Sequence, residues 1–170
     1  VDVLGTWDDH DYGKNNGDSS FELKEESREL ALNFMEVPPE DPRWQREGIY
    51  GAYDFGPIGK RTKIVLIDNR YFSSGKKTDI PDLLGNEQRA WLETTLLDSN
   101  ANLHIIVSGM QVLSAQHRWD KWFDYPNDRQ WLINLIGGSN MPLTILLSGD
   151  RHLHEISVYD DDNFAYELVD

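Results

Sequence analysis

Short apolar runs recur along the chain and predict β-strands. They are rich in β-branched and aromatic residues, and glycine, proline and acidic residues separate them, as is typical of strands and turns. The predicted strands cover residues 1–6, 49–55, 63–68, 104–108, 143–147, 156–159 and 164–168. The turn Gly56-Pro57-Ile58-Gly59 predicts a hairpin between the second and third of these strands. The polar residues 160–163 predict another hairpin between the last two strands.

Two other segments, residues 85–99 most clearly and residues 127–136, repeat apolar residues on one face, which predicts helices. A third helix is predicted over residues 25–35, where apolar residues lie among charged ones and Pro38-Pro39 ends the segment. Residues 8–20 are polar and glycine-rich and predict a loop. The alternation of strands and helices predicts a mixed α/β domain over residues 1–170, with one mixed sheet or two packed sheets covered by helices.

Composition narrows the possible functions. A chain of 170 residues with 39% hydrophobic residues can bury a sizeable core. The net charge of −14 argues against nucleic acid or an anionic membrane as a partner, and no basic track supports a nuclease. An anionic substrate would be repelled unless bound cations reversed the local field. The lack of cysteine excludes a disulfide, a thiolate zinc site and a cysteine nucleophile in this sequence.

The ends of the sequence predict a piece of a longer protein. The chain begins on a strand-like segment without methionine and ends on another. It contains no signal peptide and no apolar run long enough to span a membrane.

Two clusters of acidic residues and histidines are the candidate chemistry. Gly5-Thr6-Trp7-Asp8-Asp9-His10-Asp11-Tyr12-Gly13 follows the first apolar run, and Ser148-Gly149-Asp150-Arg151-His152-Leu153-His154-Glu155 follows residues 143–147. Ligands gather where strands end at one edge of an α/β sheet. If the second segment is extended, the spacing of Asp150, His152 and His154 places all three side chains on one face. The alternative is an exposed polar strand end.

Carboxylates and imidazoles in such clusters suit a hydrolytic metal centre. Oxygen ligands prefer hard or borderline cations, and neutral imidazole prefers zinc, iron or manganese. Asp8, Asp9, His10 and Asp11 are consecutive, so they cannot all bind one ion, and His10 could instead act as an acid toward the substrate. The alternative is that these residues form turns or cap the next helix. Both clusters together predict a metal-dependent hydrolase.

Several segments resemble, in family order, the PhoD-like (alkaline phosphatase D) family of calcineurin-like metallophosphoesterases. Besides the two clusters, the matching segments are Leu66-Ile67-Asp68-Asn69-Arg70-Tyr71-Phe72, Leu84-Gly85-Asn86-Glu87-Gln88-Arg89-Ala90-Trp91-Leu92-Glu93, Ser108-Gly109-Met110-Gln111-Val112 and Asp120-Lys121-Trp122 with Pro126. The resemblance implies a two-sheet sandwich flanked by helices, of which this chain is the carboxy-terminal part without the amino-terminal strands. It also implies hydrolysis of a phosphomonoester or phosphodiester by a metal-activated water, and a secreted or periplasmic location.

The resemblance also implies roles for individual residues. Asp9, Asp150 and His152 match metal ligands, and His10 matches the histidine that contacts phosphate. Arg70 matches a substrate-facing arginine, for which the alternative is an ion pair with Asp68 or Asp82. Asp8 and His154 are further candidates as ligands or as residues that orient them. Lys121, Trp122 and His117 lie on a loop that could border the pocket, for which the alternative is that they are simply exposed to solvent. The family suggests iron with calcium, while the residue types alone also allow zinc or manganese.

One family motif is missing from the sequence. The family carries a Gly-Asp-x-x-Tyr segment that supplies a bridging ligand, and only six residues precede Trp7 here. We therefore expect this segment alone to bind metal poorly. The alternative function is a non-catalytic, acidic, cation-binding or interaction domain that keeps the phosphatase fold.

Overall fold

The computed structural model describes residues 3–138, 141–159 and 165–169. The helices are α1 (Asp9–Tyr12), α2 (Lys24–Phe34), α3 (Gly85–Leu97) and α4 (Pro126–Ile136), with short 3₁₀ turns at Pro42–Gln45 and Trp122–Asp124. The strands are β1 (Gly51–Phe55), β2 (Thr62–Leu66), β3 (Leu103–Ser108), β4 (Leu143–Ser148), β5 (Glu155–Tyr159) and β6 (Ala165–Val169).

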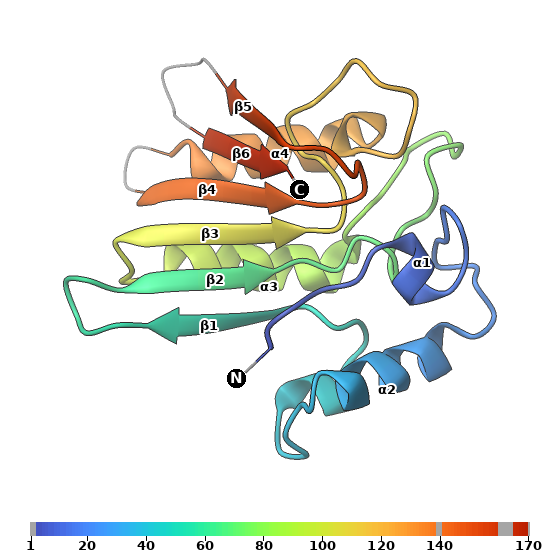
Figure 1. Ribbon diagram of the computed structural model, residues 1–170, viewed down its shortest axis with the longest axis horizontal. Helices are drawn as coiled ribbons and strands as arrows, with labels where there is room; N and C mark the ends of the chain where they lie inside the picture. Colours follow the sequence, from blue (N-terminus) through green and yellow to red (C-terminus); the bar gives the residue numbers. More distant parts are fainter. Residues whose placement is uncertain (1–2, 139–140, 160–164, 170) are drawn as a thin grey trace.

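The strands form one six-stranded mixed sheet in the order β1-β2-β3-β4-β6-β5 (Figure 1). β2, β3, β4 and β6 are parallel, while β1 and β5 pair antiparallel at the two edges. Helices α3 and α4 connect β2 to β3 and β3 to β4. The carboxyl ends of β2, β3 and β4 therefore meet at one edge of the sheet, where α1 also lies (Figure 1).

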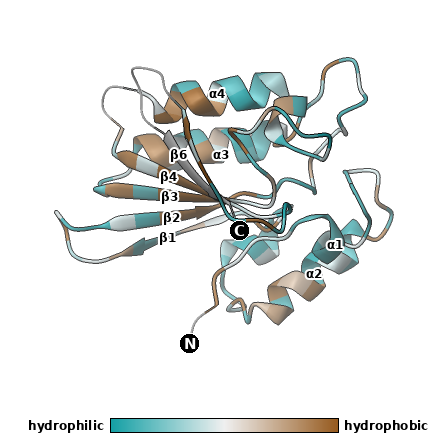
Figure 2. Ribbon diagram, turned by 45° about the horizontal axis from the view of Figure 1, so that its top comes forward, coloured by the Kyte–Doolittle hydropathy of each residue, from teal (hydrophilic) through white to brown (hydrophobic). Residues whose placement is uncertain are grey.

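One face of the sheet is covered by α3 and α4 (Figure 2). Side chains alternate between the two faces of a strand, so every second residue of the central strands points toward these helices. These side chains pack against α3 and α4 and form the main core. Its fully buried members include Val65, Ile106 and Leu146 from the strands and Leu92, Leu96 and Leu132 from the helices.

The opposite face is apolar as well, but it is only partly buried. Ile64, Ile105 and Ile145 lie side by side in register on β2, β3 and β4 and are half-buried. At the β5 edge, Ile156 is 74% exposed and Val158 is 52% exposed. We call this surface, defined by these five residues, the open sheet face.

A second, smaller core holds α1 and α2 to the ends of the strands. It contains Trp7, Tyr12, Leu32, Ile49 and Tyr71, all with exposures of 2% or less. The ring centroids of Trp7 and Tyr12 lie 5.1 Å apart in an edge-on arrangement. This core attaches the first acidic cluster to the sheet.

The predicted mixed α/β class is confirmed, but the described strands form one sheet rather than a two-sheet sandwich. The helices and the strands of residues 49–68, 104–108 and 143–159 lie close to their predicted positions. Residues 160–164, at the predicted closing turn, lie outside the described residues, although β6 does pair with β5 as predicted.

The predicted strand at residues 1–6 is wrong for the part that is described. Residues 3–6 join no ladder, and Val1 and Asp2 lie outside the described residues. Side chains attach this segment to the sheet instead: the Thr6 hydroxyl donates to the carbonyl of Ile67 at 2.7 Å. The loop predicted over residues 8–20 includes one helical turn, α1.

Candidate metal centre

A polar pocket of about 610 Å³ lies at the edge of the sheet where the parallel strands end. Most of its lining comes from the two clusters that the sequence singles out. The lining residues are Asp8, Asp9, His10, Asp11, Asn15, Asn16, Trp119, Asp120, Asp150, Arg151 and His152. The pocket thus brings together residues that are about 140 positions apart in the sequence.

Three carboxylates converge inside this pocket. Asp8, Asp9 and Asp150 each offer an oxygen, and these atoms all lie within 4.8 Å of one another. Asp9 is 6% exposed, and its Oδ2 accepts a hydrogen bond from the backbone N–H of Asn16 at 2.8 Å. Among the described residues, Oδ2 of Asp150 is buried and has no hydrogen-bond partner. A buried carboxylate oxygen requires a donor or a cation, so it fits a metal ligand.

The electrostatics of the cluster also favour a bound cation. Burial raises the pKa of Asp8 to about 6, although Arg70 lowers it, and the Asp9 and Asp150 carboxylates raise it further. Burial is also the main cause that raises the pKa of Asp150, followed by repulsion from Asp9. A cation among the three groups would remove this repulsion.

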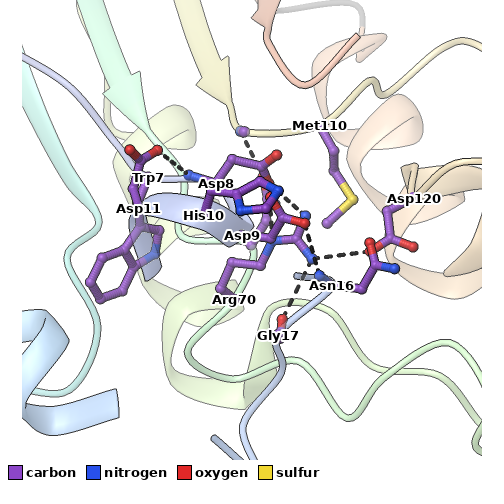
Figure 3. Close-up of polar contacts among 12 residues, drawn as sticks. Trp7, Asp8, Asp9, His10, Asp11, Asn16, Gly17, Arg70, Met110 and Asp120 are labelled. Atoms are coloured by element: carbon purple, nitrogen blue, oxygen red, sulfur yellow. Dashed lines mark hydrogen bonds and ion pairs between the residues drawn. The ribbon is translucent and has the colours of Figure 1, made fainter. Parts of the chain in front are cut away.

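The histidines lie at the border of the pocket rather than among the converging carboxylates. The side chain of His10 is 81% exposed, and its Nε2 is 4.0 Å from Oδ1 of Asp9 (Figure 3). His152 is exposed and also lines the pocket. His154 does not line it, although it is not without partners.

The extended arrangement predicted for Asp150, His152 and His154 is wrong. β5 begins only at Glu155, and Asp150 and His152 adopt left-handed backbone conformations with φ of 71° and 50°. The chain therefore turns sharply here instead of continuing β4, and the three side chains do not share one strand face. The turn is what directs Asp150 toward Asp8 and Asp9.

Arg70 lies behind the carboxylates and is 2% exposed. Its Nε and Nη2 donate to Oδ1 of Asp8 at 3.0 and 2.5 Å, and its Nη1 donates to Oδ2 of Asp120 at 3.1 Å (Figure 3). The ion pair with Asp68 or Asp82 that sequence reasoning offered is not formed; Asp68 instead accepts the backbone N–H of Arg70 at 2.9 Å. Substrate contact by Arg70 stays a prediction.

Comparison with known proteins assigns the chain to a family. The family model described as PhoD-like phosphatase matches residues 1–169. The chain belongs to the PhoD-like phosphatase family. It is 31% identical over 80 residues to "Alkaline phosphatase D" of Bacillus subtilis (strain 168), an alignment that covers 41% of this chain and 13% of that protein.

A solved structure shows the same fold. The "Structure of PhoD" superposes with a TM-score of 0.72 at 20% sequence identity, covering 96% of this chain and 38% of that chain. This PhoD-like chain therefore spans well under half the length of the relatives it matches. The predicted family and the mixed α/β fold are confirmed. Within the part of the chain that the structure describes, no helix is long and apolar enough to cross a membrane.

Sequence reasoning missed Asp68, which holds the first cluster of this PhoD-like chain in place. Asp68 is fully buried, and its carboxylate accepts four N–H donors. Oδ1 accepts the Trp7 indole at 2.8 Å and the backbone N–H groups of Arg70 and Tyr71 at 2.9 and 3.0 Å. Oδ2 accepts the backbone N–H of Ile49 at 3.0 Å. The one signal in the sequence is that Asp68 lies at the end of a predicted strand in a segment that resembles the family.

Gly109 is a second residue that sequence reasoning passed over. A Cβ atom at this position would lie 2.7 Å from the carbonyl oxygen of Trp7 and 3.0 Å from Oδ1 of Asp8. Because the first of these atoms is backbone, it cannot move aside as a flexible side chain would. Glycine at the end of β3 therefore lets the acidic segment approach the sheet.

Proposed function

We propose that this chain takes part in the metal-dependent hydrolysis of phosphoesters. The observation that carries the proposal is the convergence of Asp8, Asp9 and Asp150 at the strand ends of a PhoD-like fold. When bound, cations at such a site neutralise phosphoryl oxygens and activate water for attack on phosphorus. Both phosphomonoesters and phosphodiesters are candidate substrates. A location outside the cytoplasm and the exclusion of nucleic acid stay predictions.

The three carboxylates would hold the cation, and Asp150 is the central ligand in this proposal. Its buried, unpartnered Oδ2 fits a hard cation such as calcium or manganese. His152, at the border of the same pocket, would add an imidazole ligand, which suits iron, manganese or zinc. The pairing of iron with calcium that the family suggests is compatible with this mixed set.

His10 would act on the leaving group. Its exposed side chain borders the pocket beside Asp9, so it can reach a substrate that binds against the carboxylates. An imidazolium in this place can donate a proton to the departing oxygen. Such proton transfer contributes about 10²- to 10⁴-fold to a rate.

We also propose that a second apolar layer from the same polypeptide packs on the open sheet face. In a sheet whose helices cover one side only, an apolar second face requires a partner to be shielded from water. The half-buried isoleucines of β2, β3 and β4 and the exposed Ile156 and Val158 support this layer. The chain would then be part of a larger two-layer domain.

The test is phosphatase activity and metal content in the full-length polypeptide. Chromogenic monoester and diester substrates would be assayed with added Mn²⁺ or Ca²⁺. We expect Asp150→Asn to lose both bound metal and turnover, and His10→Ala to lose about 10²-fold or more in kcat while keeping its metal. Asp54→Asn, which removes a lysine-paired carboxylate from β1, is the control. Metal binding without turnover would favour the cation-binding module, and turnover that survives Asp150→Asn would refute the proposal.

A further inference from the structure

Asp120 is a buried carboxylate that two cations share. It is 6% exposed; its Oδ2 accepts from Nη1 of Arg70 at 3.1 Å and its Oδ1 from Nζ of Lys76 at 2.5 Å. Both oxygens are therefore used by cationic side chains, and Asp120 is not one of the three converging carboxylates. Its bonds direct the guanidinium of Arg70 rather than a metal.

The guanidinium of Arg70 connects Asp120 to Asp8. Two of its nitrogens donate to one oxygen of Asp8 and a third donates to Asp120, so the planar guanidinium is fixed on both sides. Lys76, Asp120, Arg70 and Asp8 alternate in charge, and each buried charge in the series has an opposite neighbour (Figure 3 shows the last three).

The series connects three separate loops. Asp8 lies at the start of α1, Arg70 and Lys76 follow β2, and Asp120 follows β3 (Figure 1). Asp8 belongs to a segment that joins no ladder of the sheet. The ion pairs therefore fix the carboxylate of Asp8 relative to Asp150, which comes from the loop after β4.

We propose that Asp120 and Lys76 are positioning residues of the cation site, acting through Arg70 on Asp8. This inference rests on the proposed function, because it assigns Asp8 to the cation. It gives Arg70 a role different from contact with the substrate, and the two roles predict different measurements. Removing a residue that hydrogen-bonds to a metal ligand typically weakens metal binding by about 10- to 100-fold.

The experiment measures Mn²⁺ affinity of the full-length polypeptide by calorimetry, independently of turnover. We expect Asp120→Asn to weaken Mn²⁺ binding by about tenfold or more, and Lys76→Met, at a half-exposed position, to weaken it less. Asp54→Asn, whose partner Lys63 lies 3.1 Å away, is the matched control and should leave the affinity unchanged. Far-UV circular dichroism checks that each variant is folded.

A double-mutant cycle separates positioning from general disruption. If Asp120 acts through Asp8, the variant with both Asp8→Asn and Asp120→Asn should bind Mn²⁺ as weakly as Asp8→Asn alone. Independent, additive losses would overturn the inference, as would an unchanged affinity in Asp120→Asn.

Arg70→Lys separates the two roles of the arginine. Positioning predicts a loss of Mn²⁺ affinity, because lysine cannot reproduce the fork of donors. A raised KM with unchanged Mn²⁺ affinity would show substrate contact instead and would also overturn the inference. If the unaltered protein binds no Mn²⁺, the metal site of the proposed function fails, and this inference fails with it.

Discussion

The substitution Asp68→Asn tests how the first acidic cluster is attached to the sheet. The Asp68 carboxylate lies just after β2, is fully buried, and is surrounded by four N–H donors from Trp7, Ile49, Arg70 and Tyr71. Burial raises the pKa of this group overall, and the four hydrogen bonds offset that increase only in part. Among the described residues, the carboxyl group has four N–H donors and no acceptor for a proton of its own, so we expect Asp68 to be ionised at neutral pH.

The size of the effect follows from the geometry. Three of the four bonds end on Oδ1, so the least costly orientation of asparagine puts its carbonyl oxygen there. Its NH₂ group then faces the backbone N–H of Ile49, which leaves two buried donors unsatisfied at about 1–3 kcal/mol each. The loss of the negative charge also weakens the other three bonds. We expect a decrease of about 3 kcal/mol or more in the free energy of unfolding.

Equilibrium urea unfolding at neutral pH measures this change in the full-length polypeptide. Asp54→Asn is the control, because its ion pair with Lys63 is at the surface and should contribute less than about 1 kcal/mol. If Asp68→Asn is within about 0.5 kcal/mol of the unaltered protein, the side chain is protonated in the native state. That result would contradict an ionised Asp68 held by four donors.

Three further predictions concern other parts of the molecule. Gly109→Ala should destabilise the protein by about 1–3 kcal/mol in urea and weaken Mn²⁺ binding, because its Cβ overlaps the acidic segment. Gly5→Ala is the control, because a Cβ atom at Gly5 would meet nothing within 4 Å, and it should change neither the stability nor the Mn²⁺ affinity. Equal effects of the two substitutions would contradict this prediction. Ile156→Lys should cost about 2 kcal/mol or more in the full-length polypeptide if a second layer covers the open sheet face, and an unchanged urea midpoint would argue against that layer. Burial alone would raise the pKa of Asp120, but hydrogen bonds from Lys76 and Arg70 lower it overall. Its stabilisation should therefore be complete above about pH 4 and disappear as the pH falls through the lowered pKa, so the stability difference from Asp120→Asn should narrow in acid.

Periodicity along the sequence predicts most of the fold, because the central strands and helices bury regular apolar faces. Residues 85–97 and 126–136 show a helical period, and β3 and β4 are mainly apolar, as expected of parallel strands. The prediction failed for residues 3–6, where an apolar run is held by side chains rather than by a ladder. Hydrophobicity does not show whether a backbone finds a strand to pair with, and in this run Val3 is 64% exposed.

The candidate site, like the fold, could be predicted from the sequence only in part. Asp8, Asp9 and Asp150 could be found from the sequence because they follow apolar runs whose ends meet at one edge of the sheet. The spacing of two in Asp150-x-His152-x-His154 misled, because it assumes an extended backbone where the chain turns. The roles of Asp68 and Asp120 could not be predicted from local sequence, since each has a side-chain partner 50 or more positions away.

These long-range partners explain how an acidic cluster outside the sheet can still form a precise site. Residues 6, 7 and 8 each make a side-chain bond to the segment after β2: Thr6 to Ile67, Trp7 to Asp68 and Asp8 to Arg70. Such a segment can open without unfolding the main core, because that core does not include it. The proposed cation site therefore depends on these few contacts between segments, whereas the helices and the sheet share the main core. Substitution of Asp68, or of Asp120 with its ion pairs to Arg70 and Lys76, should consequently impair metal binding under conditions in which the helices and the sheet remain intact.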